Sequence, residues 1–402
     1  MHVNGSVLRR PGMGRLTGAL LLSNSADQFT QVALLWYVLS RTGSAALVGV
    51  VVLCAGLPAV LTAPLAGRLL DRGRPSALVA ADNLARAGLL AAVPALAGLG
   101  LLTVPVLVLL ALAGGALAPL TYSGTRVLLP RLVADAELPA ANGVLSVGDQ
   151  LPYAAGPAVA GFVVARTGAP VALLLPAAGL VAAALLVRGV RPPATDRPAE
   201  PSAGRLGFGV LWEDRALRAL LVLSATYYLA YGPLEPALPV YVRHQLGAGA
   251  AAYGVLWGVF GAGALAGLAL VRPLGRLRPG VVNALGAVAW GLLVAPMALV
   301  HRTPVAFALF FCGAVAWAPY TALEMTVLQR RVPPDRLGAA IGARKAVLVA
   351  ASPAGAALGG LVTTPRTAPL VIAASAAACA VAGLGCLLSR DLRAVPGSPP
   401  AR

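Results

Sequence analysis

Charged residues are scarce in this chain. Asp, Glu, Lys and Arg make up only 11% of its 402 residues, whereas 58% are hydrophobic and the mean hydropathy is +0.82. A soluble globular protein carries about 25% charged residues. The composition therefore excludes a soluble domain and predicts a polytopic membrane protein.

Lysine, histidine and cysteine are also rare, and each scarcity excludes a class of function. The only lysine, Lys345, follows Arg344, so the Gly-Lys pair of a Walker A nucleotide-binding loop is missing. The three histidines lie near or outside the expected membrane faces and the four cysteines lie inside apolar runs, so we expect no metal site and no disulfide framework. Neither a nucleophile elbow nor a dinucleotide fingerprint occurs in a suitable context. We expect neither an ATP-driven pump nor an enzyme, and no cofactor.

Long apolar runs define the expected architecture, an all-α membrane protein with twelve transmembrane helices. The first run follows three arginines, as in a signal sequence, but it continues past Asp27 to Ser40 without a clear cleavage site, so we expect it to remain as the first helix. Runs of about 20 apolar residues bounded by Arg, Pro or Gly predict spans. They lie at 16–40, 46–70, 76–100, 104–128, 143–165, 169–188, 217–242, 252–271, 280–300, 304–328, 340–362 and 368–389.

Positive charge is distributed unevenly between the loops. The net charge is +17, but the arginines fall in short loops rather than along one helix face, so we expect a lipid bilayer and no nucleic acid as partner. With twelve spans both termini lie on one side, and all but five of the 31 Lys and Arg residues lie on that side or at the adjoining helix ends. The positive-inside rule places both termini in the cytoplasm. The great excess of Arg over Lys is typical of a GC-rich bacterium, so we expect a multi-pass protein of the bacterial plasma (inner) membrane.

The chain divides near its middle into two similar halves. A Pro-rich polar linker at 189–216 separates an N-terminal six-helix bundle, 1–188, from a C-terminal one, 217–389, which is followed by a cytoplasmic tail, 390–402. Corresponding loops repeat between the halves, as expected of two pseudo-symmetric bundles. At an offset of 199, Gly143, Gly156 and Gly161 match Gly342, Gly355 and Gly360, and at an offset of 204, Arg72, Arg74 and Pro75 match Arg276, Arg278 and Pro279.

A charged turn, Gly67-Arg68-Leu69-Leu70-Asp71-Arg72-Gly73-Arg74-Pro75, joins the second and third spans. Its charges must lie in water or among headgroups, and Gly73 and Pro75 allow a tight reversal. The turn resembles motif A of the major facilitator superfamily, G-x-L-x-D-R-x-G-R-R, although its ending is one residue shorter. The resemblance implies a gating role in conformational switching for Gly67, Asp71, Arg72 and Arg74, with Asp71 near the eleventh helix.

The fifth span contains a series of small residues that resembles motif C, the antiporter motif of the same superfamily. Gly148, Gly156 and Ala160 share a helix face and allow close backbone contact, and Pro157 favours a kink before Gly161. The resemblance implies proton-coupled export. The alternative is general close packing of small residues, because the eighth and eleventh spans contain similarly spaced glycines.

Two loops resemble one exporter branch of the superfamily, the drug:proton antiporters that include macrolide-efflux and siderophore-efflux proteins. They are Leu129-Pro130-Arg131-Leu132-Val133 and Leu328-Gln329-Arg330-Arg331-Val332-Pro333. The resemblance implies a proton-coupled exporter of amphipathic small molecules that works by alternating access. An uptake carrier or facilitator on the same scaffold, and a transport-inactive sensor or scaffold protein, remain as alternatives. We expect a monomer with a small-molecule substrate and protons as its further partners.

Three acids inside the predicted spans are candidates for proton coupling. Asp27 lies about 16 Å into the first span at 1.5 Å per residue, and Glu235 and Glu324 lie in the seventh and tenth spans. The alternatives are structural roles. Asp27 would then bond to Asn24, Gln28 or another neighbour, Glu235 would cap a helix broken by three prolines or pair with Arg243, and Glu324 would pair with Arg330 or Lys345.

Two ion pairs are expected from position. Arg126 and Glu324 fall at similar depth on equivalent helices of the two halves, so they form a candidate gate pair across the cytoplasmic mouth. Asp82 and Arg86 lie four residues apart, so we expect a local ion pair on one helix face.

Aromatic residues are concentrated in the first, fourth, seventh and tenth spans, the helices that line the central cavity in the superfamily. They are candidates for stacking against an amphipathic substrate, although Trp36 also fits an aromatic belt at the membrane interface. The candidates are Trp36, Tyr122, Tyr227, Tyr228, Tyr231, Trp317 and Tyr320.

Overall fold

The computed structural model describes residues 10–72, 74–134, 137–190 and 204–394. Within these ranges the chain consists of helices and short connections, without a β-strand. It divides into two compact units. Unit 1 comprises Met1–Thr42, Cys54–Ala199 and Gly249–Gly258, and unit 2 comprises Gly43–Leu53, Glu200–Ala248 and Val259–Arg402. Part of the predicted linker, 191–203, and most of the predicted tail, 395–402, lie outside the described residues.

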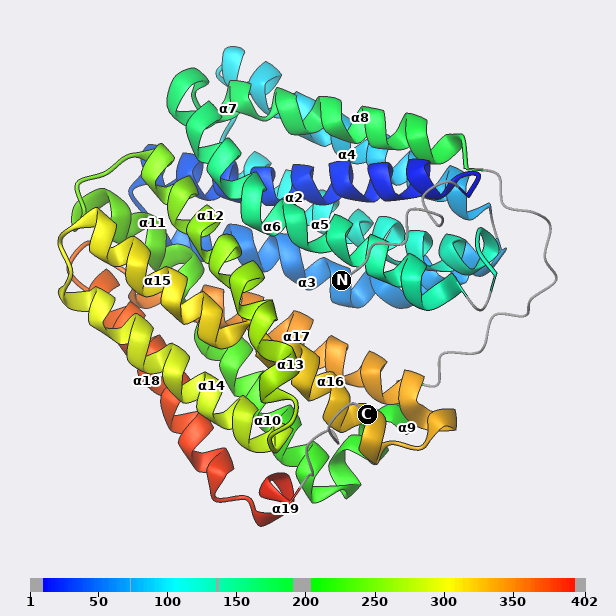
Figure 1. Ribbon diagram of the computed structural model, residues 1–402. Coiled ribbons are helices and arrows are strands. Elements are labelled where there is room, and N and C mark those ends of the chain that lie inside the picture. Colours follow the sequence, from blue (N-terminus) through cyan, green and yellow to red (C-terminus); the bar gives the residue numbers. More distant parts are fainter. Residues whose placement is uncertain (1–9, 73, 135–136, 191–203, 395–402) are drawn as a thin grey trace. The chain divides into compact units, whose positions relative to one another are not determined.

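Unit 1 is a bundle of long helices in which α2 packs against α6 and α8, and α4 packs against α5 and α8 (Figure 1). A cluster of buried apolar side chains, among them Leu16, Val79, Leu128, Val144 and Val187, joins these five helices. The elements are α2 (Met13–Thr42), α3 (Ala45–Arg72), α4 (Pro75–Gly98), α5 (Val104–Leu128), η1 (Leu129–Arg131), α6 (Leu138–Thr167), α7 (Ala169–Ala172) and α8 (Leu174–Arg188).

Unit 2 is a second helical bundle, in which α14 packs against α18 and α10 packs against α17 and α18. Part of the predicted linker is helical here, because α9 packs against α17. The elements are α9 (Gly204–Glu213), α10 (Arg215–Tyr231), α11 (Leu234–His244), α12 (Ala250–Gly267), η3 (Leu268–Leu270), α13 (Val271–Leu274), α14 (Pro279–Val294), η4 (Ala295–Leu299), α15 (Thr303–Trp317), α16 (Pro319–Arg331), α17 (Pro334–Val362), α18 (Ala368–Leu387) and α19 (Arg390–Arg393).

Nine segments of the described chain are long and apolar enough to cross a membrane, and each coincides with a predicted span. The three remaining predicted spans are also helical, but they are more polar or interrupted. The first, α2, has Asn24, Asp27 and Gln28 within about one turn, and the fifth, α6, has Asp149 and Gln150. The seventh span is divided into α10 and α11. These polar helices supply much of the candidate site described below.

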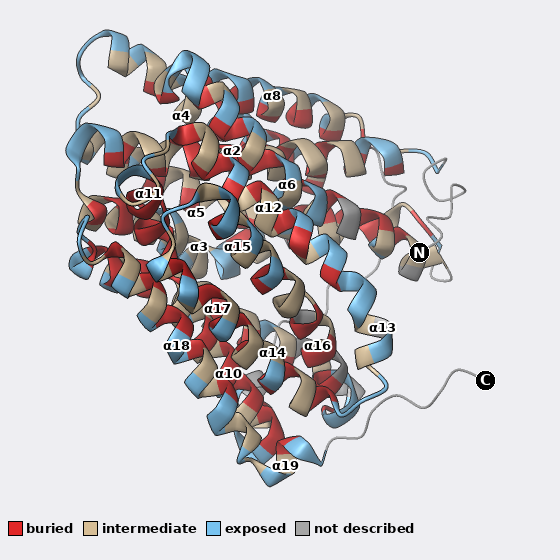
Figure 2. Ribbon diagram, turned by 60° about the vertical axis from the view of Figure 1, so that its left-hand side comes forward, coloured by how far each residue is buried: buried red, intermediate tan, exposed pale blue. Residues whose placement is uncertain are grey.

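The outer faces of the helices remain apolar. In Figure 2, α8 and α18 have buried positions on one side and exposed positions on the other. Large apolar side chains on such exposed faces include Leu61, Leu185, Leu361 and Val381, each more than 60% exposed. Water would make such a surface costly, whereas the hydrocarbon of a bilayer is a suitable solvent for it.

Glycine contacts explain why two helix ends belong to a different unit from the rest of their helix. The first residues of α3 lie in unit 2, where a Cβ added at Gly49 would come within 3.2 Å of the Cα of Gly360. The first residues of α12 lie in unit 1, where a Cβ at Gly161 would lie 2.7 Å from the Cα of Gly254. Glycine at these positions allows the backbones to approach this closely.

The N-terminus of α10 carries a side-chain cap that gives the first testable prediction. Asp214 Oδ1 accepts hydrogen bonds from the backbone N–H groups of Ala216 (2.8 Å) and Leu217 (3.0 Å), and Oδ2 accepts one from Arg331 (3.0 Å). Burial acts to raise the pKa of Asp214, but these hydrogen bonds outweigh burial, so the pKa lies below its usual value. Asp214→Ala should lower the free energy of unfolding by about 1 kcal/mol at neutral pH.

This loss should depend on pH in a defined direction. Because the folded-state pKa of Asp214 is depressed, its contribution is present above the unfolded-state pKa and disappears as the pH falls through the folded-state pKa. Unfolding of the detergent-purified protein, followed by circular dichroism across a pH series, measures the difference between variant and wild type. Glu213→Ala, at the exposed neighbouring position, is the control. An equal loss in both variants would rule out the capping role.

Candidate functional site

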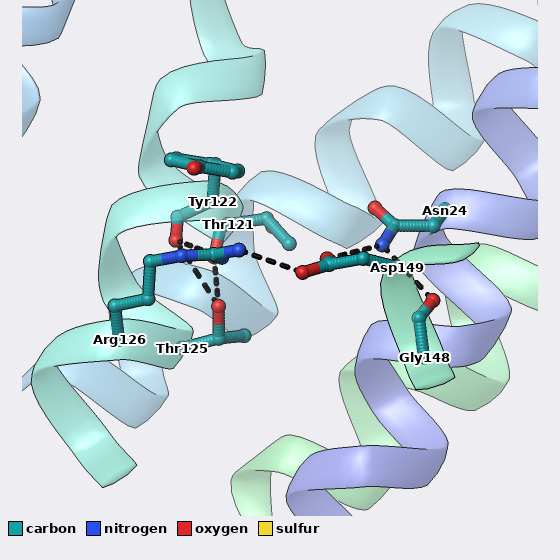
Figure 3. A network of polar contacts seen from close by, with 7 residues as sticks. All are labelled: Asn24, Thr121, Tyr122, Thr125, Arg126, Gly148 and Asp149. Carbon is teal, nitrogen blue, oxygen red and sulfur yellow. Dashed lines mark hydrogen bonds and ion pairs between the residues drawn. The ribbon is translucent and has the colours of Figure 1, made fainter. Parts of the chain in front are cut away.

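An ion pair in unit 1 joins the fourth and fifth predicted spans, and a hydrogen bond links it to the first span (Figure 3). Arg126 of α5 donates from Nη2 to Asp149 Oδ2 of α6 at 2.8 Å, and Asn24 Nδ2 of α2 donates to Asp149 Oδ1 at 3.1 Å and to the carbonyl of Gly148 at 3.2 Å. The Arg126 guanidinium carbon also lies 3.7 Å from the centroid of the Tyr122 ring, which belongs to the preceding turn of α5. Both charged side chains are about one-third exposed, so a proton or a ligand can reach them.

A second ion pair in unit 1 joins α2 to α4. Arg86 pairs with Asp27, a predicted proton-coupling residue, and the Asp27 side chain remains 41% exposed while that of Arg86 is 10% exposed. The predicted pair of Asp82 with Arg86 is wrong. Arg86 reaches across to the other helix, whereas Asp82 accepts a hydrogen bond from Thr121 Oγ1 of α5.

Unit 2 contains a more deeply buried ion pair on the equivalent helices. Glu324 of α16 is fully buried and receives two hydrogen bonds from Arg344 of α17, one of them from Nε at 2.6 Å. Ser224 of α10 donates to Glu324 Oε1 at 2.5 Å and lies 2.8 Å from the hydroxyl of Tyr320. Because the single Ser224 proton goes to the carboxylate, Tyr320 is the donor to Ser224.

The Arg126–Asp149 and Arg344–Glu324 pairs have the acid and the cation in opposite order along the chain. In unit 1 the cation is on the fourth span and the acid on the fifth, whereas in unit 2 the acid is on the fourth span of its half and the cation on the fifth. In each unit the first span of the half adds a neutral hydrogen-bond donor, Asn24 or Ser224.

The predicted gate pair of Arg126 with Glu324, which would join the two halves when the cytoplasmic mouth closes, remains a prediction. Each residue has its ion partner inside its own unit, Asp149 for Arg126 and Arg344 for Glu324. A charge on a membrane helix is stabilised by the nearest opposite charge on a packed neighbour, and in both units that neighbour is the next helix along the chain. The alternative expected for Glu324 was Arg330 or Lys345, and the partner that the structure shows, Arg344, is the neighbour of Lys345 in the chain.

Most of the candidate cavity aromatics form one stack in unit 2. The Tyr227 and Trp317 rings are parallel with centroids 3.6 Å apart, and Trp317 stacks on Tyr320 at 4.3 Å. Tyr228 and Tyr231 lie at its edge, with ring centroids 5.9 and 6.2 Å from that of Tyr227. Tyr227 and Tyr320 are only 2% exposed, so they act as packing residues, and Trp317, Tyr228 and Tyr231 are the members with surface available to a ligand.

The two aromatic candidates of unit 1 lie apart from each other. Tyr122 is 42% exposed and covers Arg126. Trp36 of α2 stacks against Tyr253 of α12 with ring centroids 5.9 Å apart, within unit 1.

Glu235 lies just after the break in the seventh span. The helix α10 ends at Tyr231, α11 begins at Leu234, and Glu235 is in the first turn of α11 with 8% of its surface exposed. A carboxylate in the first turn is favoured by the helix dipole. A Cβ at Gly232 would lie 2.6 Å from the backbone nitrogen of Ala356, so the break packs directly against α17.

The two predicted motifs are found in different settings. In the charged turn, α3 ends at Arg72 and α4 begins at Pro75, with Arg74 exposed and extended as its N-cap. A side chain at Gly67 would meet nothing within 4 Å, and the side chains of Asp71 and Arg72 lie outside the described residues.

The small residues of α6 contact two helices. Gly148 and Gly156 face α2, where a Cβ at Gly156 would lie 2.9 Å from Gln28 Cβ, and Gly161 faces Gly254 of α12. Ala160 is fully buried, and α6 continues as one helix through Pro152 and Pro157.

Sequence reasoning missed Asp149, Arg344 and the role of Arg86. A signal was present for the first two, because both are ionisable residues inside predicted membrane spans, where such residues are rare. The partner of Arg86 had no such signal, since the approach of Arg86 on α4 to Asp27 on α2 is a property of the folded bundle.

The exposure of the Arg126–Asp149 pair gives a second prediction. Asp149→Asn should change the free energy of unfolding by no more than about 1 kcal/mol, because partly exposed ion pairs contribute little to stability. The amide oxygen can still accept from Arg126, while the amide nitrogen takes the place of the oxygen that accepts from Asn24. Denaturant unfolding in detergent measures this, and a loss of several kcal/mol would show that the pair is effectively buried.

Comparison with known proteins places these features in a family. The model of the Major Facilitator Superfamily matches residues 16–356. The chain is 30% identical over 377 residues to the MFS-type transporter y4rN of Sinorhizobium fredii, with 92% of this chain and 93% of that protein covered. It is also 30% identical over 370 residues to the multidrug efflux pump Tap of Mycobacterium tuberculosis, with 86% and 85% covered.

A solved structure shows the same fold. A bacterial homologue of the iron transporter ferroportin, in an inward-facing state, superposes with a TM-score of 0.75 at 19% identity, with 94% of this chain and 98% of that chain covered. The helical architecture, the apolar spans and the full-length matches lead to one conclusion. The chain is a membrane transporter of the Major Facilitator Superfamily, and not an enzyme.

Proposed function

We propose that this transporter is a proton-coupled exporter of amphipathic small molecules. The observation that carries the proposal is the set of carboxylates held by arginines inside the membrane bundles, Asp27, Asp149 and Glu324. A proton bound at or beside such a pair changes the attraction between the carboxylate and its arginine, so protonation can be converted into a change of helix contacts. Alternating access would then expose the site to one side of the membrane at a time.

Two observations support export rather than uptake. The identity to the multidrug efflux pump Tap extends over most of both chains. The small residues of α6, which resemble the antiporter motif, contact both α2 and α12. A movement of α6 relative to either helix would therefore change these contacts. The half-buried side chains of Trp317, Tyr228 and Tyr231 provide an apolar, aromatic surface for the cargo.

The location follows from charge. The excess of arginine on the side of the termini favours a bacterial inner-membrane protein with both termini in the cytoplasm. We further propose that the transporter acts as a monomer, with two halves of six helices divided at the linker, 189–216.

Transport in everted membrane vesicles tests the proposal. Ethidium serves as a probe of the amphipathic cation class, and the vesicle lumen is acidified. A proton-coupled exporter should accumulate ethidium in the lumen, and collapse of the pH gradient with nigericin should release it. Equilibration that does not respond to the gradient would indicate a facilitator, and no flux above vesicles without the protein would favour a sensor or scaffold.

A further inference from the structure

A buried acid in unit 1 has no cationic partner among the described residues. Asp82 is 2% exposed and lies about 10 Å along α4 from Pro75, at 1.5 Å per residue. Its Oδ2 accepts a hydrogen bond from Thr121 Oγ1, and its Oδ1 has no hydrogen-bond partner in the described part of the chain. A buried carboxylate without a cation is costly, and its neutral form avoids that cost.

The neighbouring side chain completes this arrangement. Asn83, which is 1% exposed, donates from Nδ2 to Thr121 Oγ1 at 2.9 Å and to the carbonyl of Val79 at 2.8 Å, while its own Oδ1 also lacks a partner among the described residues. Asp82 and Asn83 thus bond to the same hydroxyl, and each retains one buried oxygen that can only accept. A proton on Asp82 Oδ1 would remove the buried charge and turn one of these two oxygens into a donor.

No other charge takes the place of that proton. The helices that pack against α4 are α5, α7 and α8, and Arg86 brings in α2. None of the ionisable side chains on these neighbouring helices is the partner of Asp82 in the described structure, and Arg126 is bound to Asp149. These side chains are Arg15, Asp27, Tyr37 and Arg41 on α2, Tyr122 and Arg126 on α5, and Arg188 on α8.

Arg86 is the cation that lies within reach of Asp82. It follows Asp82 by four residues on the same helix, a spacing at which side chains are neighbours, yet it pairs with Asp27. Two carboxylates therefore compete for one guanidinium, and the structure has it on Asp27.

We propose that Asp82 is the site that binds the coupling proton, and that Arg86 moves between Asp82 and Asp27 according to its occupancy. Loss of the proton leaves Asp82 as a carboxylate, which draws Arg86 away from Asp27. Uptake of one proton neutralises Asp82 and returns Arg86 to Asp27, so one proton is exchanged for one change of ion pair between α2 and α4. The structure corresponds to the protonated state. This inference rests on the proposed function and names the residue that couples it to protons.

Infrared difference spectroscopy of the full-length protein in liposomes tests the protonation directly, without a substrate. The wild type at neutral pH should show the carbonyl stretch of a buried neutral carboxyl, and Asp82→Asn, which keeps the shape of the side chain, should lack it. Asp27→Asn should also lose the band, because Arg86 is then free to pair with an ionised Asp82. Asp149→Asn is the matched control and should retain it. A wild-type band that persists in Asp82→Asn would overturn the assignment.

Transport separates this inference from the proposed function. In everted vesicles, Asp82→Asn should lose the stimulation of ethidium accumulation by the pH gradient but keep gradient-independent exchange, and Asp82→Glu should regain part of the stimulation. If the wild type itself shows no stimulation, proton-coupled export is wrong and the infrared band alone decides the state of Asp82. Disappearance of the band with sodium chloride but not choline chloride, at constant pH, would show that the site takes sodium and would contradict the proton.

Discussion

Replacing Arg344 with methionine is expected to lower the free energy of unfolding by about 3–5 kcal/mol, because it leaves a buried carboxylate without its cation. Glu324 is fully buried, and Arg344 supplies two of its hydrogen bonds. Methionine retains most of the apolar volume of the arginine stem, so the loss reports on the charge and not on a cavity. Denaturant unfolding of the detergent-purified protein, followed by tryptophan fluorescence, measures it.

Two further variants make the prediction specific to the ion pair. The double variant Arg344→Met with Glu324→Leu removes both charges and should recover most of the lost stability, since apolar replacement of a whole buried pair is often close to neutral. Asp149→Asn, in the more exposed pair of unit 1, should lose no more than about 1 kcal/mol. A double variant as unstable as Arg344→Met would mean that shape, and not charge, is what Arg344 contributes.

Replacing Gly161 with valine should have the second largest effect. A Cβ at this position would lie 2.6 Å from the carbonyl oxygen of Ala250 and 2.7 Å from the Cα of Gly254, both of which are backbone atoms that cannot turn aside. The two helices would have to separate, at a cost of about 1–3 kcal/mol. The same measurement of unfolding tests this, and ethidium transport should fall with it.

Gly143, on the same helix, provides the matched control. A Cβ there would meet nothing within 4 Å, so Gly143→Ala should be tolerated and should stabilise α6 by up to about 1 kcal/mol through helix propensity. If valine at 161 were tolerated as well as alanine at 143, α6 and α12 would not depend on their close approach.

The fold could be predicted largely from hydropathy, because hydrocarbon requires every backbone group to be paired within its own helix. Nine spans are apolar enough to be recognised by composition alone. The other three were recognisable because polar residues such as Asp27 are surrounded by long apolar runs. The division of α10 from α11 also follows from local chemistry, since Pro233 cannot donate the backbone hydrogen bond that a continuous helix needs.

The site was less predictable, because ion partners depend on packing between helices. The i, i+4 spacing of Asp82 and Arg86 favours a pair on one helix face, but it carries no information about Asp27. Asp27 lies 59 positions from Arg86 in the chain and is the residue that pairs with it. Glu324 was identified as buried and ionisable, whereas its pairing with Arg344 required the packing of α16 against α17. The roles of all these residues in coupling remain predictions.

The exchanged ends of α3 and α12 have a consequence for cutting the chain. Gly49 is packed against Gly360, and Gly254 against Gly161, so each sequence half buries one helix end of the other. A proteolytic nick within 191–203 would break the covalent link but leave both of these glycine contacts in place. The two fragments should therefore co-purify, and a gene split at this point should still yield an assembled protein.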